Sequence, residues 1–216
     1  MTRWTISEPT ELDFDSVKVL RVRIVAGSVN VVGTDETARL EVTDLDGPPL
    51  QVSLKDGELV VAYDDVSWPG ILSWVTSRRR SATISVAVPW DSSVQLGVVT
   101  ASAVVSGIHG CTSIRSVSGN VTLEGLTDTV DAETVSGDLE TKSLAGDLRF
   151  STVSGDLTVV DGSSTLLRAN SISGDVALDV DVARGSEIEL TSVSGDVRVR
   201  LPHNTDVQVD IPVPWP

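Results

Sequence analysis

The stretch Thr134-Val135-Ser136-Gly137-Asp138 occurs in closely related form five times in the second half of this chain. A weaker copy, Ser143-Leu144-Ala145-Gly146-Asp147, begins halfway between two of them. A period near 18 residues with an echo at half the period predicts a coil that makes similar turns on two sides. The other four copies are Ser116-Val117-Ser118-Gly119-Asn120, Thr152-Val153-Ser154-Gly155-Asp156, Ser171-Ile172-Ser173-Gly174-Asp175 and Ser192-Val193-Ser194-Gly195-Asp196.

The residues around each copy alternate between apolar and polar. Val121 and Leu123 follow the first copy, and Leu157 and Val159 follow the third. Alternation with period two predicts strands that have one face inward and one face in water. Each unit is too short to bury its own apolar face, so consecutive units must stack. The sequence therefore predicts an all-β protein, a parallel β-solenoid with rungs of 18–21 residues. An antiparallel sandwich is less favoured, because a sandwich has no reason to make its loops alike.

The repeated turn residues are interpreted as structural. Glycine suits a corner where a side chain would clash or where φ must be positive, and the flanking Ser and Asp can bond to nearby backbone. Stacked aspartates would also suit a row of calcium ions. Calcium-binding repeats, however, need several glycines per turn, so no metal and no cofactor is expected. The turn residues are Gly119, Gly137, Asp138, Gly146, Gly155, Asp156, Gly174, Asp175, Gly195 and Asp196.

Residues 1–81 are predicted to form an irregular N-terminal β cap, continuous as one domain with the repeats of residues 82–216. The cap contains a predicted strand region from Val17 to Val32 with a turn at Ala26-Gly27-Ser28. Asp56-Gly57, between two further strands, is typical of a β-hairpin. At the other end, residues 201–209 resemble residues 88–96, so the tail is either a proline-rich cap or leads into further β structure in the natural protein.

Residues 64–80 interrupt the alternation with an apolar, aromatic and finally basic segment. Such a composition suits a contact with a protein partner or a membrane surface. The competing interpretation is a lid that folds over the end of the solenoid. The predicted contact residues are Trp68, Ile71, Leu72, Trp74, Arg78, Arg79 and Arg80.

Composition excludes several classes of protein. The net charge of -15 argues against a nucleic-acid partner, because binding there depends on cations that neutralise phosphates. Cys111 is the only cysteine, and His109 and His203 are the only histidines, so neither a disulfide framework nor a catalytic triad is expected. Neither a signal peptide nor a membrane-spanning stretch is recognisable, so a cytoplasmic location is expected.

The Val88-Pro89 strand start and the ladder of Val-Ser-Gly-Asp turns resemble the bacterial "toastrack" β-repeat proteins of the DUF4097 family, over about residues 82–210. The resemblance implies a right-handed β-helix and lends no catalytic residues. Its relatives include adhesin-like proteins and parts of membrane-stress sensors. We therefore expect a non-enzymatic scaffold that binds a protein partner or itself. The alternatives are a membrane-stress sensing domain and, less favoured, a polysaccharide-active β-helix enzyme.

Overall fold

The structure is a computed structural model that describes residues 2–63, 80–181, 185–203 and 208. The regular elements of these residues are 20 strands in two sheets of ten, so the predicted all-β class is confirmed. The described part of the chain contains no helix of the length and hydrophobicity that a membrane span needs.

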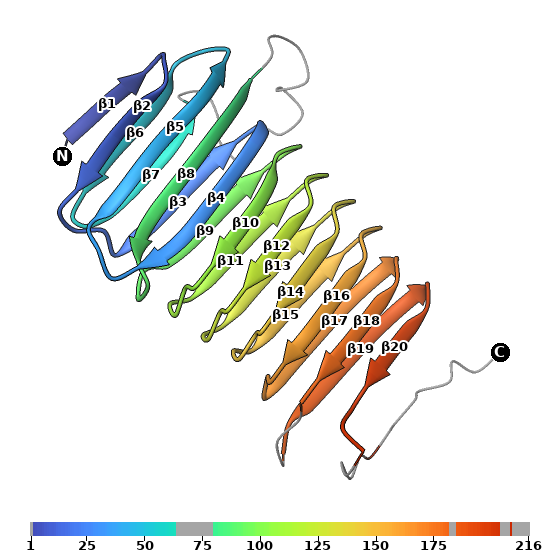
Figure 1. Ribbon diagram of the computed structural model, residues 1–216. Coiled ribbons are helices and arrows are strands. Elements are labelled where there is room, and N and C mark those ends of the chain that lie inside the picture. Colours follow the sequence, from blue (N-terminus) through green and yellow to red (C-terminus); the bar gives the residue numbers. More distant parts are fainter. Residues whose placement is uncertain (1, 64–79, 182–184, 204–207, 209–216) are drawn as a thin grey trace.

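The two sheets face each other along the whole stack (Figure 1). From one edge to the other, sheet A consists of β1 (Thr2–Ile6), β6 (Leu50–Lys55), β7 (Glu58–Tyr63), β3 (Val19–Ile24), β9 (Ser93–Val98), β11 (Thr112–Ser116), β13 (Val130–Thr134), β15 (Leu148–Thr152), β17 (Leu166–Ser173) and β19 (Glu187–Ser194). Sheet B consists of β2 (Thr10–Phe14), β5 (Ala38–Asp46), β8 (Ser81–Pro89), β4 (Ala26–Thr34), β10 (Ser102–Ser106), β12 (Val121–Glu124), β14 (Leu139–Lys142), β16 (Leu157–Gly162), β18 (Val176–Val180) and β20 (Val197–Arg200).

From β9 onward, the chain alternates between the sheets, and each strand pairs in parallel with the strand one rung earlier. Val130 of β13 pairs with Leu148 of β15, an offset of 18 residues, and Leu148 pairs with Leu167 of β17, an offset of 19. The offset is still 18 where Lys142 of β14 pairs with Val160 of β16, so the extra residue enters the chain after Val160 and before Leu167. The stacked coil is a β-solenoid.

The first eight strands are arranged less regularly. β3 and β4 form a parallel rung that lies between the rung of β7 and β8 and the rung of β9 and β10, out of chain order. β1, β2, β5 and β6 pair antiparallel at the N-terminal end. Asp56 and Gly57 form the tight turn between β6 and β7, which confirms the predicted hairpin.

The turn predicted at Ala26-Gly27-Ser28 is wrong. These residues lie inside β4, and the chain bends one residue earlier, at Val25. A Cβ at Gly27 would lie 2.1 Å from the carbonyl oxygen of Ala82 in β8. Gly27 also has a φ of 104°, so glycine is needed here both for the close approach of the two strands and for its backbone conformation. Both requirements have the same sequence signature as a turn.

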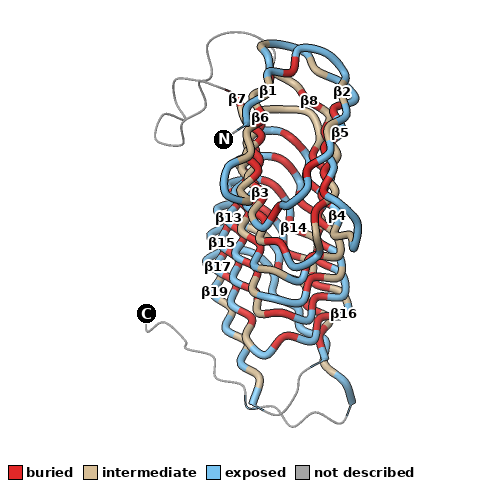
Figure 2. The backbone as a smooth tube through the Cα atoms, turned by 90° about the vertical axis from the view of Figure 1, so that its left-hand side faces the viewer, coloured by how far each residue is buried: buried red, intermediate tan, exposed pale blue. Residues whose placement is uncertain are grey.

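One hydrophobic core fills the space between the sheets. It extends from Ile6 to Val180 and contains the inward-facing residues of nearly every strand (Figure 2). Leu139, Leu157 and Val176, which directly follow the repeated aspartates, are buried as the alternation predicts. At the C-terminal end, Val197 and Val199 of β20 are 44% and 43% exposed, because among the described residues no later rung covers them.

Candidate binding surface

The repeated glycines lie where one rung contacts the next. A Cβ at Gly137 would lie 2.2 Å from the carbonyl oxygen of Gly119, and one at Gly155 would lie 2.1 Å from that of Gly137. Neither glycine has a positive φ. Only Gly174 and Gly195, the last two of the row, combine the close approach with positive φ values of 152° and 128°. At this corner, glycine is therefore needed mainly because a side chain would clash with the backbone of the neighbouring rung.

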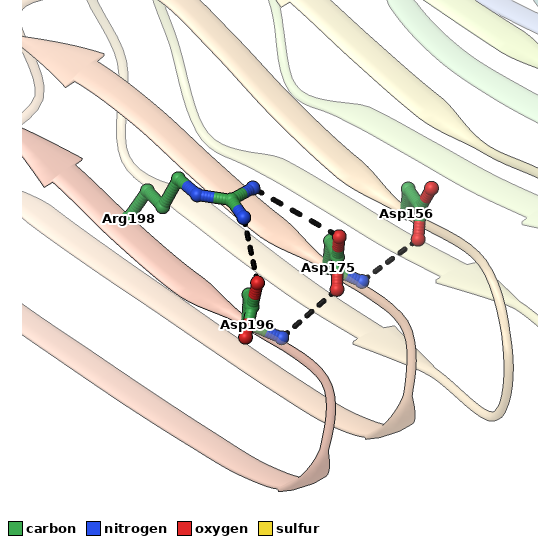
Figure 3. A network of polar contacts seen from close by, with 4 residues as sticks. All are labelled: Asp156, Asp175, Asp196 and Arg198. Carbon is green, nitrogen blue, oxygen red and sulfur yellow. Dashed lines mark hydrogen bonds and ion pairs between the residues drawn. The ribbon is translucent and has the colours of Figure 1, made fainter.

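The repeated aspartates form a ladder of hydrogen bonds along this corner. The backbone N–H of Asp156 donates to Oδ1 of Asp138 at 3.0 Å, and the N–H of Asp175 donates to Oδ1 of Asp156 at 2.7 Å. The N–H of Asp196 continues the ladder to Asp175 (Figure 3). Asn120 begins it, since its amide oxygen accepts from the N–H of Asp138. Each side chain therefore joins two rungs, which stabilises the stack.

Serines reinforce the same corner. The hydroxyl of Ser136 donates to the carbonyl of Val117, and the hydroxyl of Ser154 donates to the carbonyl of Val135, both at 3.2 Å. At the end of the ladder, Arg198 pairs with Asp196 at 2.6 Å and approaches Asp175 at 3.9 Å (Figure 3). Within the described residues no cluster of three or more metal-ligating side chains occurs. The carboxylates of the ladder bind backbone N–H groups and, at its end, an arginine.

Gly146 and Asp147, the half-period copy, lie on another corner. A Cβ at Gly146 would lie 1.8 Å from the carbonyl oxygen of Asp128. The Oδ1 atom of Asp147 accepts hydrogen bonds from the hydroxyl of Thr165 and the backbone N–H of Leu166, both one rung later. At both corners, a glycine allows close contact between rungs, and the aspartate that follows it accepts a hydrogen bond from the next rung.

The middle residue of each repeat makes an exposed apolar row beside the aspartate ladder. Val135 and Val153 are 47% and 46% exposed, and Ile172 and Val193 are 54% and 78% exposed. Because the rungs are about 4.8 Å apart, these side chains form a continuous stripe, which we call the corner stripe. This surface was not predicted from the sequence, although the position of each apolar residue between two polar turn residues was a signal for exposure.

The predicted contact segment of residues 64–80 lies outside the described residues except for Arg80. The carbonyl of Arg80 accepts a hydrogen bond from the N–H of Ala26 at 3.1 Å, directly before β8. Partner contact by Trp68, Ile71, Leu72, Trp74, Arg78 and Arg79 stays a prediction.

The reactive residue types are dispersed over the surface. The ring of His109 packs against Trp90 with centroids 4.9 Å apart. The thiol of Cys111 donates to the carboxylate of Asp128 at 3.3 Å, and this hydrogen bond is the main cause that raises the pKa of the thiol. A raised pKa makes the thiol a poorer nucleophile at neutral pH. His203 lines a separate open hollow of about 460 Å³ near β18 and β20, together with Asp161, Asp179 and Arg200.

Three solved structures of bacterial proteins are similar to this chain. A "putative adhesin" from Parabacteroides distasonis is 12% identical, with a TM-score of 0.44, and the match covers 92% of this chain and 97% of that protein. A "putative lipid binding protein" from the same organism is 11% identical, with a TM-score of 0.46 and coverages of 89% and 97%. A "putative adhesin" from Parabacteroides merdae is 10% identical, with a TM-score of 0.36 and coverages of 89% and 96%. A comparison with curated proteins finds no match.

The region that matches a known protein family is longer than the repeats alone. The profile of the family described as Toastrack DUF4097 matches residues 51–213. The matched region begins in β6 and includes every strand of the regular stack. The chain belongs to the Toastrack DUF4097 family.

Proposed function

We propose that this protein is a non-enzymatic scaffold that binds a protein partner through the corner stripe. The observation that carries the proposal is the repetition of one exposed apolar side chain per rung, from Val135 to Val193. Single exposed apolar residues are ordinary, whereas a continuous apolar surface bordered by polar residues marks an interaction site. The adhesin-like names of the similar proteins support a role in binding.

The chemistry of the corner stripe also specifies the kind of partner. The aspartate ladder runs beside the stripe, and the whole chain carries a net charge of -15. A partner segment with apolar side chains flanked by lysine or arginine would match both features. The acidic surface disfavours nucleic acid for the same reason. We also propose that the solenoid winds in a right-handed sense and that its N-terminal cap ends at residue 81.

The test compares two double variants of the full chain. Val153→Ser with Ile172→Ser removes the centre of the corner stripe, whereas Val32→Ser with Val104→Ser removes two side chains of similar exposure from the outer face of sheet B. Proteins retained from an extract of the cells that naturally make this protein are quantified by mass spectrometry, and binding is then repeated with the purified partner.

The proposal requires a partner that is retained by wild-type protein and by the sheet B variant but lost with the stripe variant. Equal retention by both variants would contradict the proposed surface. Release of reducing ends from a panel of polysaccharides would contradict the non-enzymatic assignment.

A further inference from the structure

A shallow hollow on the outer face of sheet A gathers three arginines in this acidic protein. It has a volume of about 160 Å³ and lies across β3, β9 and β11. Two rows of paired residues cross it. Arg21, Gln95 and Ser113 form the first row, and Arg23, Gly97 and Arg115 form the second. The hollow thus combines guanidinium groups with an amide and a hydroxyl.

Gly97 creates the hollow. It lies in the middle of the second row, flanked by two arginines, and its neighbours Leu96 and Val98 point into the core. Its backbone does not have the positive φ that would demand glycine. A side chain at this position would extend outward between Arg23 and Arg115. Because glycine has no side chain, an open space remains there, and the long side chains on either side surround it.

The polar groups around this space are incompletely satisfied. Nη1 of Arg21 pairs with Glu58 at 2.7 Å, but its buried Nε–H has no acceptor among the described residues. Nε of Arg115 pairs with Glu133 at 3.1 Å. For Arg23 the described residues provide no ion-pair partner. A buried donor without an acceptor and an unpaired cation both favour an anionic hydrogen-bond acceptor in the hollow.

The surroundings restrict the charge of that acceptor. Glu58 and Glu133 flank the hollow on opposite sides, and Asp131 pairs with Ser113 at its border. A dianion such as phosphate would be repelled by these carboxylates, whereas a planar monoanion matches the planar guanidinium groups. We propose that the hollow of Arg21, Arg23, Gln95, Gly97, Ser113 and Arg115 binds a carboxylate group. This site does not depend on the corner stripe.

The experiment follows the arginine Nε–H and backbone amide signals of the full chain by NMR while sodium acetate replaces sodium chloride at constant ionic strength. The proposal predicts saturable shifts for Arg21 Nε–H and the Gly97 amide. Glucuronate and N-acetylalanine are titrated in parallel, because each carries a single carboxylate, on a sugar and on an amino acid respectively, and so they distinguish the source of the ligand.

Matched variants distinguish binding of acetate in the hollow from nonspecific electrostatic attraction to surface arginines. Arg23→Gln should weaken acetate binding at least fivefold, and Gly97→Leu, which fills the hollow and keeps every charge, should abolish it. Arg149→Gln removes an equal charge from the outer face of β15 and should change the affinity by less than twofold. Linear shifts without saturation, or equal weakening by Arg23→Gln and Arg149→Gln, would overturn the proposal. Arg23→Gln alone decides the matter if Gly97→Leu does not fold.

Discussion

The hairpin of β6 and β7 and the regular stack use the same kind of strand, but glycine serves a different need in each. At the hairpin of β6 and β7, Gly57 has a φ of 81°, and an added Cβ would make only ordinary contacts, the closest at 3.5 Å to Lys18. In the stack, Gly155 lacks a positive φ, yet an added Cβ would lie 2.1 Å from the carbonyl oxygen of Gly137. The first glycine allows the backbone conformation of its own turn. The second leaves room for a chain segment 18 residues away in the sequence. In the repeats, contact between rungs therefore determines the residue type.

The largest effect is expected for Gly155→Ala. The added methyl group meets backbone, which cannot rotate away, so the corner must open. We expect a loss of about 3 kcal/mol in the free energy of unfolding. Urea denaturation followed by circular dichroism measures it. A loss below that of Gly57→Ala would contradict the role assigned to close approach.

Gly57→Ala is the matched substitution in the hairpin. The cost comes only from placing alanine at a positive φ, so we expect about 1–2 kcal/mol in the same assay. The hairpin strands should remain paired, which the amide signals of residues 50–63 would report. If this variant were as stable as wild-type protein, the hairpin would have to use a different turn.

Asp156→Ala should have a smaller effect. It removes the acceptor for the N–H of Asp175, a hydrogen bond at the surface, for which about 1 kcal/mol is expected. Asp156→Asn is the control, since Asn120 fills the equivalent place at the start of the ladder. The asparagine variant should retain most of the stability. Equal losses for the two variants would show that charge, and not the accepted hydrogen bond, is what matters at this corner.

The smallest effect is expected for calcium. The aspartate ladder uses its Oδ1 atoms to accept backbone hydrogen bonds, and the described residues form no group that could hold a metal ion. Millimolar calcium should therefore change the melting temperature by less than about 1 °C, whereas a native-state ligand would raise it. Calorimetry with calcium and with EDTA gives the comparison.

The sequence predicts the regular stack well because its information is local and repeated. The period of the glycines corresponds to the pairing offsets, and the alternation after Asp156 identifies Leu157 as buried. The order of rungs at the N-terminal end was not predictable. Nothing in residues 19–34 indicates that β3 and β4 lie between two rungs formed much later in the chain. That arrangement rests on pairs between strands that are far apart in the sequence, such as β3 with β9 and β4 with β8, which a local pattern cannot identify.

The candidate surfaces were less predictable than the fold. The glycines and aspartates of the corner were recognised from their repetition, but the backbone donor to each aspartate carboxylate was expected nearby in the same turn. The structure places the bonded partners one rung apart. Similarly, Arg23 and Arg115 are far apart in the sequence, and only the stacking of β3, β9 and β11 brings them to one hollow.

Direct stacking of each rung on the preceding one is tested most sharply by disulfide trapping. In a Cys111→Ser background, Ser151→Cys with Asn170→Cys places two thiols at outward positions that are paired between β15 and β17. Ser151→Cys with Thr191→Cys places them two rungs apart, beyond the reach of a disulfide. Mild oxidation should close the first disulfide completely and leave the second pair reduced. Equal oxidation of both pairs, or of neither, would contradict the stacked arrangement.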